Sequence, residues 1–170
     1  MPGYSFDAGT LFGSTSVEPL PPAPPGEILL RVPAAISPRL LRESDVGRQL
    51  IWQHQVWYDE YQWANEPVLP GLYHLRLPIP GSNNKTFDEQ KALLLEAEEP
   101  TSLVLVELAL LCFEKAGLPD PLQESWVCCS ETAYEGRVML CWYNGRLNLV
   151  DHWYVNRYST IWHSAARRVS

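Results

Sequence analysis

The fold that we expect for this chain is decided by its C-terminal stretch, GRVMLCWYNGRLNLVDHWYVNRYSTIWHSAARRVS, from Gly136 to Ser170. Two apolar, strand-like runs, 138–143 and 147–150, flank the dipeptide Asn144-Gly145. Asn and Gly both tolerate the positive φ angles of a type I′ turn, so such runs around Asn-Gly are a strong signal for a β-hairpin. The sequence therefore predicts antiparallel strands at this end of the chain.

The residues after the hairpin are rich in aromatic and hydrogen-bonding side chains. Between His152 and His163 the chain carries two tryptophans and two tyrosines among asparagine, arginine, serine and threonine. Aromatic side chains give contact area for a small loss of conformational entropy, and short polar side chains adapt their hydrogen bonds. This composition is typical of recognition surfaces, and we interpret the stretch as a binding face.

Upstream of the hairpin, the sequence predicts a buried helix over 101–116. Thr101 or Ser102 provides the N-cap, and Gly117 ends the helix. The helix is apolar nearly all round, which is typical of a helix at the centre of a core. Its apolar run is interrupted by Glu107 and is too short to span a bilayer, so we expect no membrane insertion.

Local signals place the other elements. Ser37-Pro38 starts a helix, and Thr86 with Glu89 forms a capping box that opens a helix to about residue 95. The stretch 39–63 fits a helix in one part and an alternating strand in another, with helix favoured for part of it. Further strands are predicted over 27–32, 72–79 and 126–130. This order predicts the α+β class, with a mostly antiparallel C-terminal sheet packed on two or three helices.

The charge balance argues against nucleic acid as a partner. The formal net charge is −7, whereas phosphate backbones bind basic surfaces. From Arg137 onward the chain has five arginines and one acid, Asp151. Solvated arginines and an anionic ligand both fit this local excess, and solvated arginines are the commoner case.

The first residues and the cysteines indicate a compartment. Residues 1–20 lack both the basic and the apolar region of a secretory signal. Four cysteines without such a signal are typical of reduced thiols, so we expect a cytoplasmic protein. Display on a surface by another route stays open.

The cysteines do not have the spacing of a metal site. Cys128, Cys129 and Cys141 with His152 resemble a zinc set in residue type only. Zinc ligands are usually paired as C-x2-4-C, whereas adjacent cysteines on a strand point to opposite faces. The sequence therefore predicts buried cysteines, no metal and no cofactor.

Two other functions stay open beside recognition. A small cytoplasmic enzyme of unknown reaction would use His54 or His152 beside Asp59, Glu60 or Asp151 in a cleft, with convergent titratable groups. A structural assembly subunit would instead pack its proline-rich N-terminus onto a neighbouring copy. No glycine-rich phosphate loop or nucleophile elbow supports the enzyme.

A compositional filter applies to residues 146–164. This range has no Lys, Glu, Gln or Met, and apart from its two tryptophans every residue type is encoded by a codon that ends in a pyrimidine. In this the C-terminal end resembles the variable region of target proteins of diversity-generating retroelements, from bacteria and phages. In that family, copying errors at adenines randomise chosen Asn-type codons, and the fold is usually C-type-lectin-like.

The resemblance implies a division of the C-terminal residues into framework and variable positions. The framework positions would be Gly145, Arg146, Leu147, Trp153, Arg157, Trp162, Ala165, Ala166 and Arg167. The variable, ligand-binding positions would be Asn148, Val150, Asp151, His152, Tyr154, Val155, Asn156, Tyr158, Ser159, Thr160 and His163. The chain lacks the loop for calcium-dependent sugar binding, so the resemblance implies neither calcium nor a particular sugar.

From these observations we expect a non-catalytic recognition protein. Residues 1–26 would be an extended, proline-rich segment, and 27–170 a single α+β ligand-binding domain whose variable region is about 146–164. The ligand would be a protein or another macromolecule. We further expect Trp153 or Trp162 to be buried beneath a solvent-accessible set of contact residues. That set is Tyr154, Asn156, Tyr158, Ser159 and His163.

Overall fold

The computed structural model describes residues 1–14, 18–123, 125–134, 136–152 and 160–169, and for His152 only the backbone. The strands are β1 (Tyr4–Asp7), β2 (Ile28–Val32), β3 (Gly71–Arg76), β4 (Glu99–Pro100), β5 (Trp126–Ala133), β6 (Gly136–Tyr143), β7 (Arg146–His152), β8 (Ile161–His163) and β9 (Ala165–Val169). The α-helices are α1 (Pro38–Glu43), α2 (Asp45–Leu50), α3 (Phe87–Lys91) and α4 (Leu103–Lys115). Short 3₁₀ helices are η1 (Ala8–Phe12), η2 (Val56–Glu60) and η3 (Gln62–Ala64).

The described strands form two sheets. The first has the order β1-β2-β3-β9-β4, and the second has the order β7-β6-β5-β8. Within them, β1 runs parallel to β2 and β8 runs parallel to β5, while the other neighbours are antiparallel. The chain is therefore of the mixed α+β class, as the order of local signals predicts. Its strands form two mostly antiparallel sheets, whereas the sequence predicts one C-terminal sheet.

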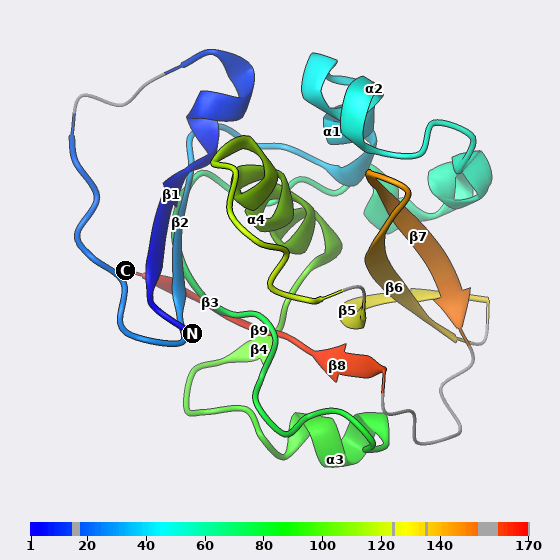
Figure 1. Cartoon of the computed structure of the whole chain (residues 1–170). Coiled ribbons are helices and arrows are strands. Elements are labelled where there is room, and N and C mark those ends of the chain that lie inside the picture. The colour runs from blue at the N-terminus through cyan, green and yellow to red at the C-terminus, as the bar shows by residue number, and fades with distance from the viewer. Residues whose placement is uncertain (15–17, 124, 135, 153–159, 170) are drawn as a thin grey trace.

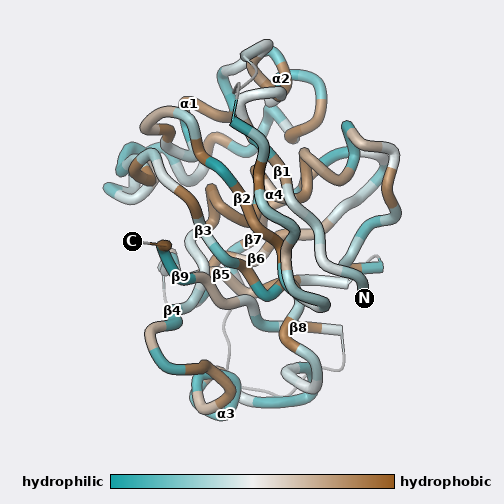
Figure 2. Tube along the Cα trace, turned by 90° about the vertical axis from the view of Figure 1, so that its left-hand side faces the viewer, coloured by the Kyte–Doolittle hydropathy of each residue, from teal (hydrophilic) through white to brown (hydrophobic). Residues whose placement is uncertain are grey.

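Helix α4 lies between the two sheets, at the centre of the molecule (Figure 1). Every side chain from Leu103 to Phe113 is buried, and the leucines 103, 108, 110 and 111 are fully enclosed. The hydropathy colouring in Figure 2 is brown through much of this centre, where α4 lies against the strands. The prediction of a central, buried helix is confirmed.

The predicted hairpin is also confirmed. Tyr143 pairs with Arg146 across the turn, and Asn144 and Gly145 have φ angles of 50° and 73°. These positive φ angles at both central residues are those of a type I′ turn. The pairing of β6 with β7 continues from there to Arg137 and His152, so the hairpin is longer than the apolar runs indicate.

The outer edge of β7 is covered by the segment that follows α2. The Trp52 N–H donates to the Leu147 carbonyl at 3.0 Å. The Gln55 side-chain amide accepts from the Leu149 N–H and donates to the Leu149 carbonyl. Since an uncovered edge strand offers free hydrogen-bonding groups, Gln55 acts here as a short substitute for a neighbouring strand.

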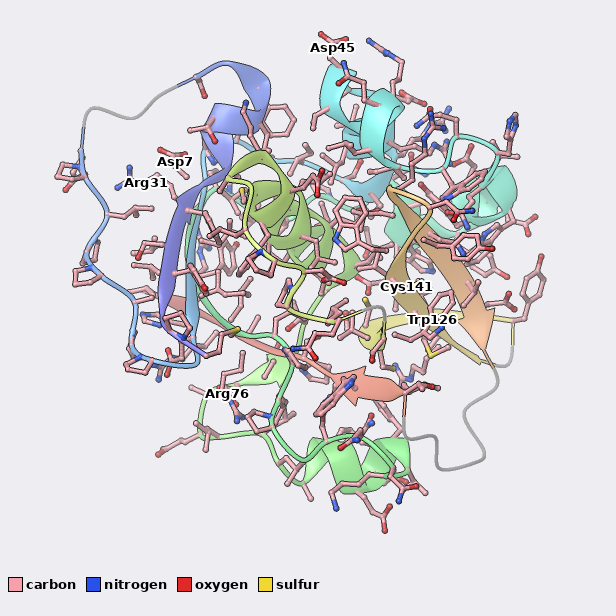
Figure 3. The ribbon with its side chains drawn as sticks, in the orientation of Figure 1. Asp7, Arg31, Asp45, Arg76, Trp126 and Cys141 are labelled. Atoms are coloured by element: carbon pink, nitrogen blue, oxygen red, sulfur yellow. The ribbon has the colours of Figure 1, made fainter. Side chains whose placement is uncertain are left out.

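Three local predictions differ from the structure. Residues 4–12 of the proline-rich segment form β1 and η1, and Asp7 caps η1 and pairs with Arg31 at 3.4 Å (Figure 3). Helix α3 ends at Lys91 because Arg76 donates to the Leu93 carbonyl and to Glu98, which holds the next residues in turns. Strand β3 ends at Arg76, before prolines that have no N–H to donate.

Among the described residues, no helix is both long and apolar enough to cross a membrane.

Replacing Leu110 with alanine should lower the free energy of unfolding by about 2–5 kcal/mol, because it removes a fully buried side chain and leaves a cavity. The matched control is Leu95→Ala, since Leu95 is 56% exposed and its loss should change stability by less than about 0.5 kcal/mol. Urea denaturation of both variants measures the difference. Equal effects would contradict the central position of α4.

Candidate functional site

The candidate binding region is anchored at both ends. Strand β7 pairs with β6 along its whole length, and β8 pairs with β5. The two strands form opposite edges of the second sheet, and β9 then continues into the middle of the first sheet. The backbone on either side of residues 153–159 is therefore held by hydrogen bonds within the second sheet, and β9 joins the chain after β8 to the first sheet. Functional residues are commonly presented by a rigid scaffold of this kind.

Alternation along β7 separates its two faces. Leu147 and Leu149 are buried in the main core. Val150 packs against a second apolar cluster on the other face of this sheet, whose buried members are Cys128, Met139 and Ile161. Val150 is therefore half-buried rather than free on the surface.

The other predicted contact residues that the structure describes differ in how exposed they are. Asn148 is half-buried, and its side-chain carbonyl accepts a hydrogen bond from Gln55. Asp151 and Thr160 are exposed. Five of the predicted positions lie outside the described residues: Tyr154, Val155, Asn156, Tyr158 and Ser159. For His152 the structure describes the backbone but not the side chain.

The prediction that His163 is solvent-accessible is wrong, because the side chain is fully buried. Its backbone N–H donates to the Ser82 hydroxyl at 2.9 Å, and its ring packs edge-on against Phe87 of α3, with the ring centres 5.4 Å apart. The parallel pairing of β8 with β5 sets His163 beside Cys128, on the face that α3 covers. A fully buried imidazole makes no contact with a macromolecular ligand.

The environment of His163 keeps the ring neutral. Burial lowers its pKa to about 4, and the nearby cations Arg137, Arg76 and Lys91 act in the same direction. Arg137 stacks on Phe87 with its guanidinium carbon 3.9 Å from the ring centre. Within the described part of the chain, neither ring nitrogen of His163 has a hydrogen-bond partner.

Trp162 occupies an intermediate position. It is half-buried, and it lines a hollow together with Tyr4, Pro78 and Pro119. Trp162 therefore shares this hollow with the N-terminal part of the chain, which its predicted framework role did not include. Trp153, the other predicted anchor, lies outside the described residues.

Of the residues named for an enzyme, the structure describes the side chains of His54, Asp59, Glu60 and Asp151. Asp59 accepts from Arg42 at 2.8 Å, and Arg42 also donates to the Gln55 carbonyl. His54 is exposed, and Asp151 lies on the second sheet. The Arg42–Asp59 pair thus fixes the segment that covers β7.

The cysteines behave as buried apolar residues. All four are free and buried. Burial raises the pKa of the Cys128 thiol to about 12 and that of the Cys141 thiol to about 11. Thiols with such pKa values are poor nucleophiles and poor metal ligands. No group of three or more potential metal ligands gathers within the described ranges.

A buried acid, Glu107, and a half-buried acid near it, Glu131, were missed as a pair by sequence reasoning. Glu107 is fully buried in α4, and its carboxylate oxygens have no hydrogen-bond partner among the described residues. Burial raises its pKa well above the ordinary value, and nearby Glu131 adds to this, while Arg42 opposes it. Burial also raises the pKa of Glu131 to about 7, although its carboxylate accepts from the Leu103 N–H at 2.8 Å. The only sequence signal was a single acid in an apolar helix.

Comparison of the chain with protein-family models, curated proteins and solved structures found no match.

Replacing Glu107 with glutamine should stabilise the protein at pH 8. In the wild type, unfolded Glu107 ionises near pH 4.5 whereas the native residue keeps its proton, so stability falls as pH rises from about 4.5 through the native pKa. We expect the variant to gain at least about 1 kcal/mol over the wild type between pH 4.5 and 8. Urea denaturation at the two pH values measures this. The exposed Glu66→Gln is the control, and the same gain in both variants would contradict the assignment.

Replacing His163 with leucine should make the protein lose less stability when the pH is lowered. Unfolded His163 takes up a proton near pH 6.5, whereas the native ring does so only near pH 4. The contribution of His163 to the free energy of unfolding therefore falls as the pH falls through this range. Between pH 7 and 4.5 the variant should lose about 2–3 kcal/mol less than the wild type. The exposed His54→Leu is the control. An unchanged pH dependence in His163→Leu would show that the ring is not held neutral.

Proposed function

We propose that this chain is a non-catalytic recognition protein, the variable target protein of a diversity-generating retroelement with a C-type-lectin-like fold. Its ligand would be a protein or another macromolecule. The observation that carries the proposal is the anchoring of the filtered segment: β7 and β8 hold its two ends at opposite edges of one sheet. Substitutions in a segment held in this way change the side chains that it presents without changing the sheet that holds it.

Burial supports the division into framework and variable positions. The framework residues Leu147 and Ala165 are fully buried, and Gly145 has the positive φ angle that the hairpin turn requires. The variable residues Asp151 and Thr160 are exposed. Replacements at exposed positions usually change stability by less than about 0.5 kcal/mol, so diversity there is tolerated.

The proposed binding set is narrower than the sequence predicts. His163 is excluded because it is buried, and Asn148 and Val150 contact the scaffold. Asp151 and Thr160 remain from the described residues, and the predicted positions among residues 152–159 complete the set.

The pairing of the last strand supports a compact scaffold. β9 lies beside β3 along its whole length, with α4 and β5–β8 between them in the chain. The segment from β3 to β9 therefore closes on itself around α4 and presents its last strands at one side, as a C-type-lectin-like scaffold would.

Sequencing the gene from many cells of one source population tests this function. Amino-acid replacements should gather in the codons for residues 148–160 and trace to adenines in a nearby near-copy of that segment, beside a reverse transcriptase gene. The codons for residues 71–76, in the scaffold strand β3, serve as the control region. Equal replacement frequencies in the two regions, or no near-copy, would contradict the proposal.

A further inference from the structure

A hollow of about 630 Å³ lies where the C-terminal end of α4 meets the β6–β7 hairpin. This volume is in the range of small-molecule and side-chain binding sites. Its lining includes Trp126, Trp142 and Tyr143, and Cys141 lies beside Trp126 on the sheet (Figure 3). Trp142 lies on the face of the sheet that packs on the main core, and Trp126 lies on the other face. None of these residues belongs to the proposed variable set.

The aromatic side of this hollow is held in place by packing. Trp142 packs partly against the main core, and Trp126 packs partly against the second apolar cluster. The backbone of Trp126 is held as well, because its backbone N–H donates to the Thr160 carbonyl at 2.9 Å. Because each indole is fixed by a different cluster, the rings are positioned before any ligand arrives, which lowers the entropy lost on binding.

The lining of the hollow also carries negative charge. Glu114, in the last turn of α4, and Asp120, in the following segment, both line it. Asp120 is oriented by the Leu122 N–H, which donates to its carboxylate at 2.9 Å. The C-terminal end of a helix also carries partial negative charge. The one basic residue in this turn, Lys115, is directed elsewhere, since its ammonium group donates to the Thr10 carbonyl.

A second hollow of about 460 Å³ adjoins the first and shares Phe113 and Asp120 with it. Its lining includes Tyr4, Trp162 and four prolines, at positions 78, 80, 119 and 121. Aromatic and proline-rich grooves of this kind suit an extended peptide, whose backbone and apolar side chains lie along the rings. Together the two hollows are larger than one charged side chain requires.

We infer that the first hollow binds the guanidinium group of an arginine in an extended peptide segment of a protein partner, and that the second hollow takes the flanking residues. A guanidinium stacks on an aromatic face and pairs with a carboxylate at the same time, which matches Trp142 and Glu114, both in the lining of the first hollow. This site does not depend on the proposed diversification, because its residues lie outside the variable set.

Titration of the ¹⁵N-labelled full chain with a blocked proline-arginine-proline peptide tests the inference. The indole N–H resonances of Trp126 and Trp142 should shift, and a peptide with citrulline, which has the same shape without the charge, should bind at least about fivefold more weakly. Glu114→Gln should weaken binding of the arginine peptide about two- to fivefold, as expected for one exposed ion pair. Glu66→Gln removes the same charge away from the hollow and should leave binding unchanged.

Several outcomes would overturn the inference. No shift of the two indole resonances, or equal binding of the citrulline peptide, would exclude a guanidinium site. Equal binding of a lysine peptide would exclude the stacking geometry. Equal binding of blocked arginine alone would exclude a peptide that occupies the second hollow. None of these outcomes changes the expectation for sequence diversity in residues 148–160, so the two proposals fail separately.

Discussion

The side chains of α4 from Leu103 to Phe113 contact both sheets, and the positions of the other elements follow from that contact. Because the helix is apolar nearly all round, one sheet alone would leave half of its surface in water. The first sheet covers one side with β1 and β2, and the second covers another with β5 and β6 (Figure 1). The chain then links the two sheets at β8 and β9, where the backbone passes from one to the other at Ser164. The Ser164 hydroxyl donates to the Cys128 carbonyl, and its own carbonyl accepts from the Thr101 N–H, beside the start of α4.

The elements that could be predicted from sequence are those specified by neighbouring residues. Asn144-Gly145 specifies a two-residue turn, Thr86 with Glu89 specifies a capping box, and the apolar run after Ser102 specifies a buried helix. Contacts between distant segments left no local signal. Examples are the parallel pairing of β1 with β2 and of β8 with β5, and the Gln55 amide on β7. Each depends on where the main core places two parts of the chain.

The difference between local signals and contacts of distant segments also decides how much of the candidate site could be predicted. Composition identified a segment with recognition-type side chains, but burial of a single residue depends on its strand partner. His163 is buried because β8 pairs with β5 under α3, which spacing within residues 146–164 does not specify. The hollow beside α4 was not predicted for the same reason: Glu114, Asp120, Trp126 and Trp142 come together only when the hairpin packs against the end of the helix. The proposed variable surface reaches β8 at Thr160, and the second hollow reaches this strand at Trp162.

The central claim is that the C-terminal strands are a fixed framework for replaceable surface residues. The most direct test is a saturation scan of the described positions between residues 146 and 169, with resistance to protease as the measure of folding. We expect Asp151 and Thr160 to accept nearly all residue types, whereas few should be accepted at Leu147, Leu149, Ile161, His163 and Ala165. Equal tolerance at the two groups of positions would contradict it, because then neither the pairing nor the burial of these strands would separate framework from variable surface.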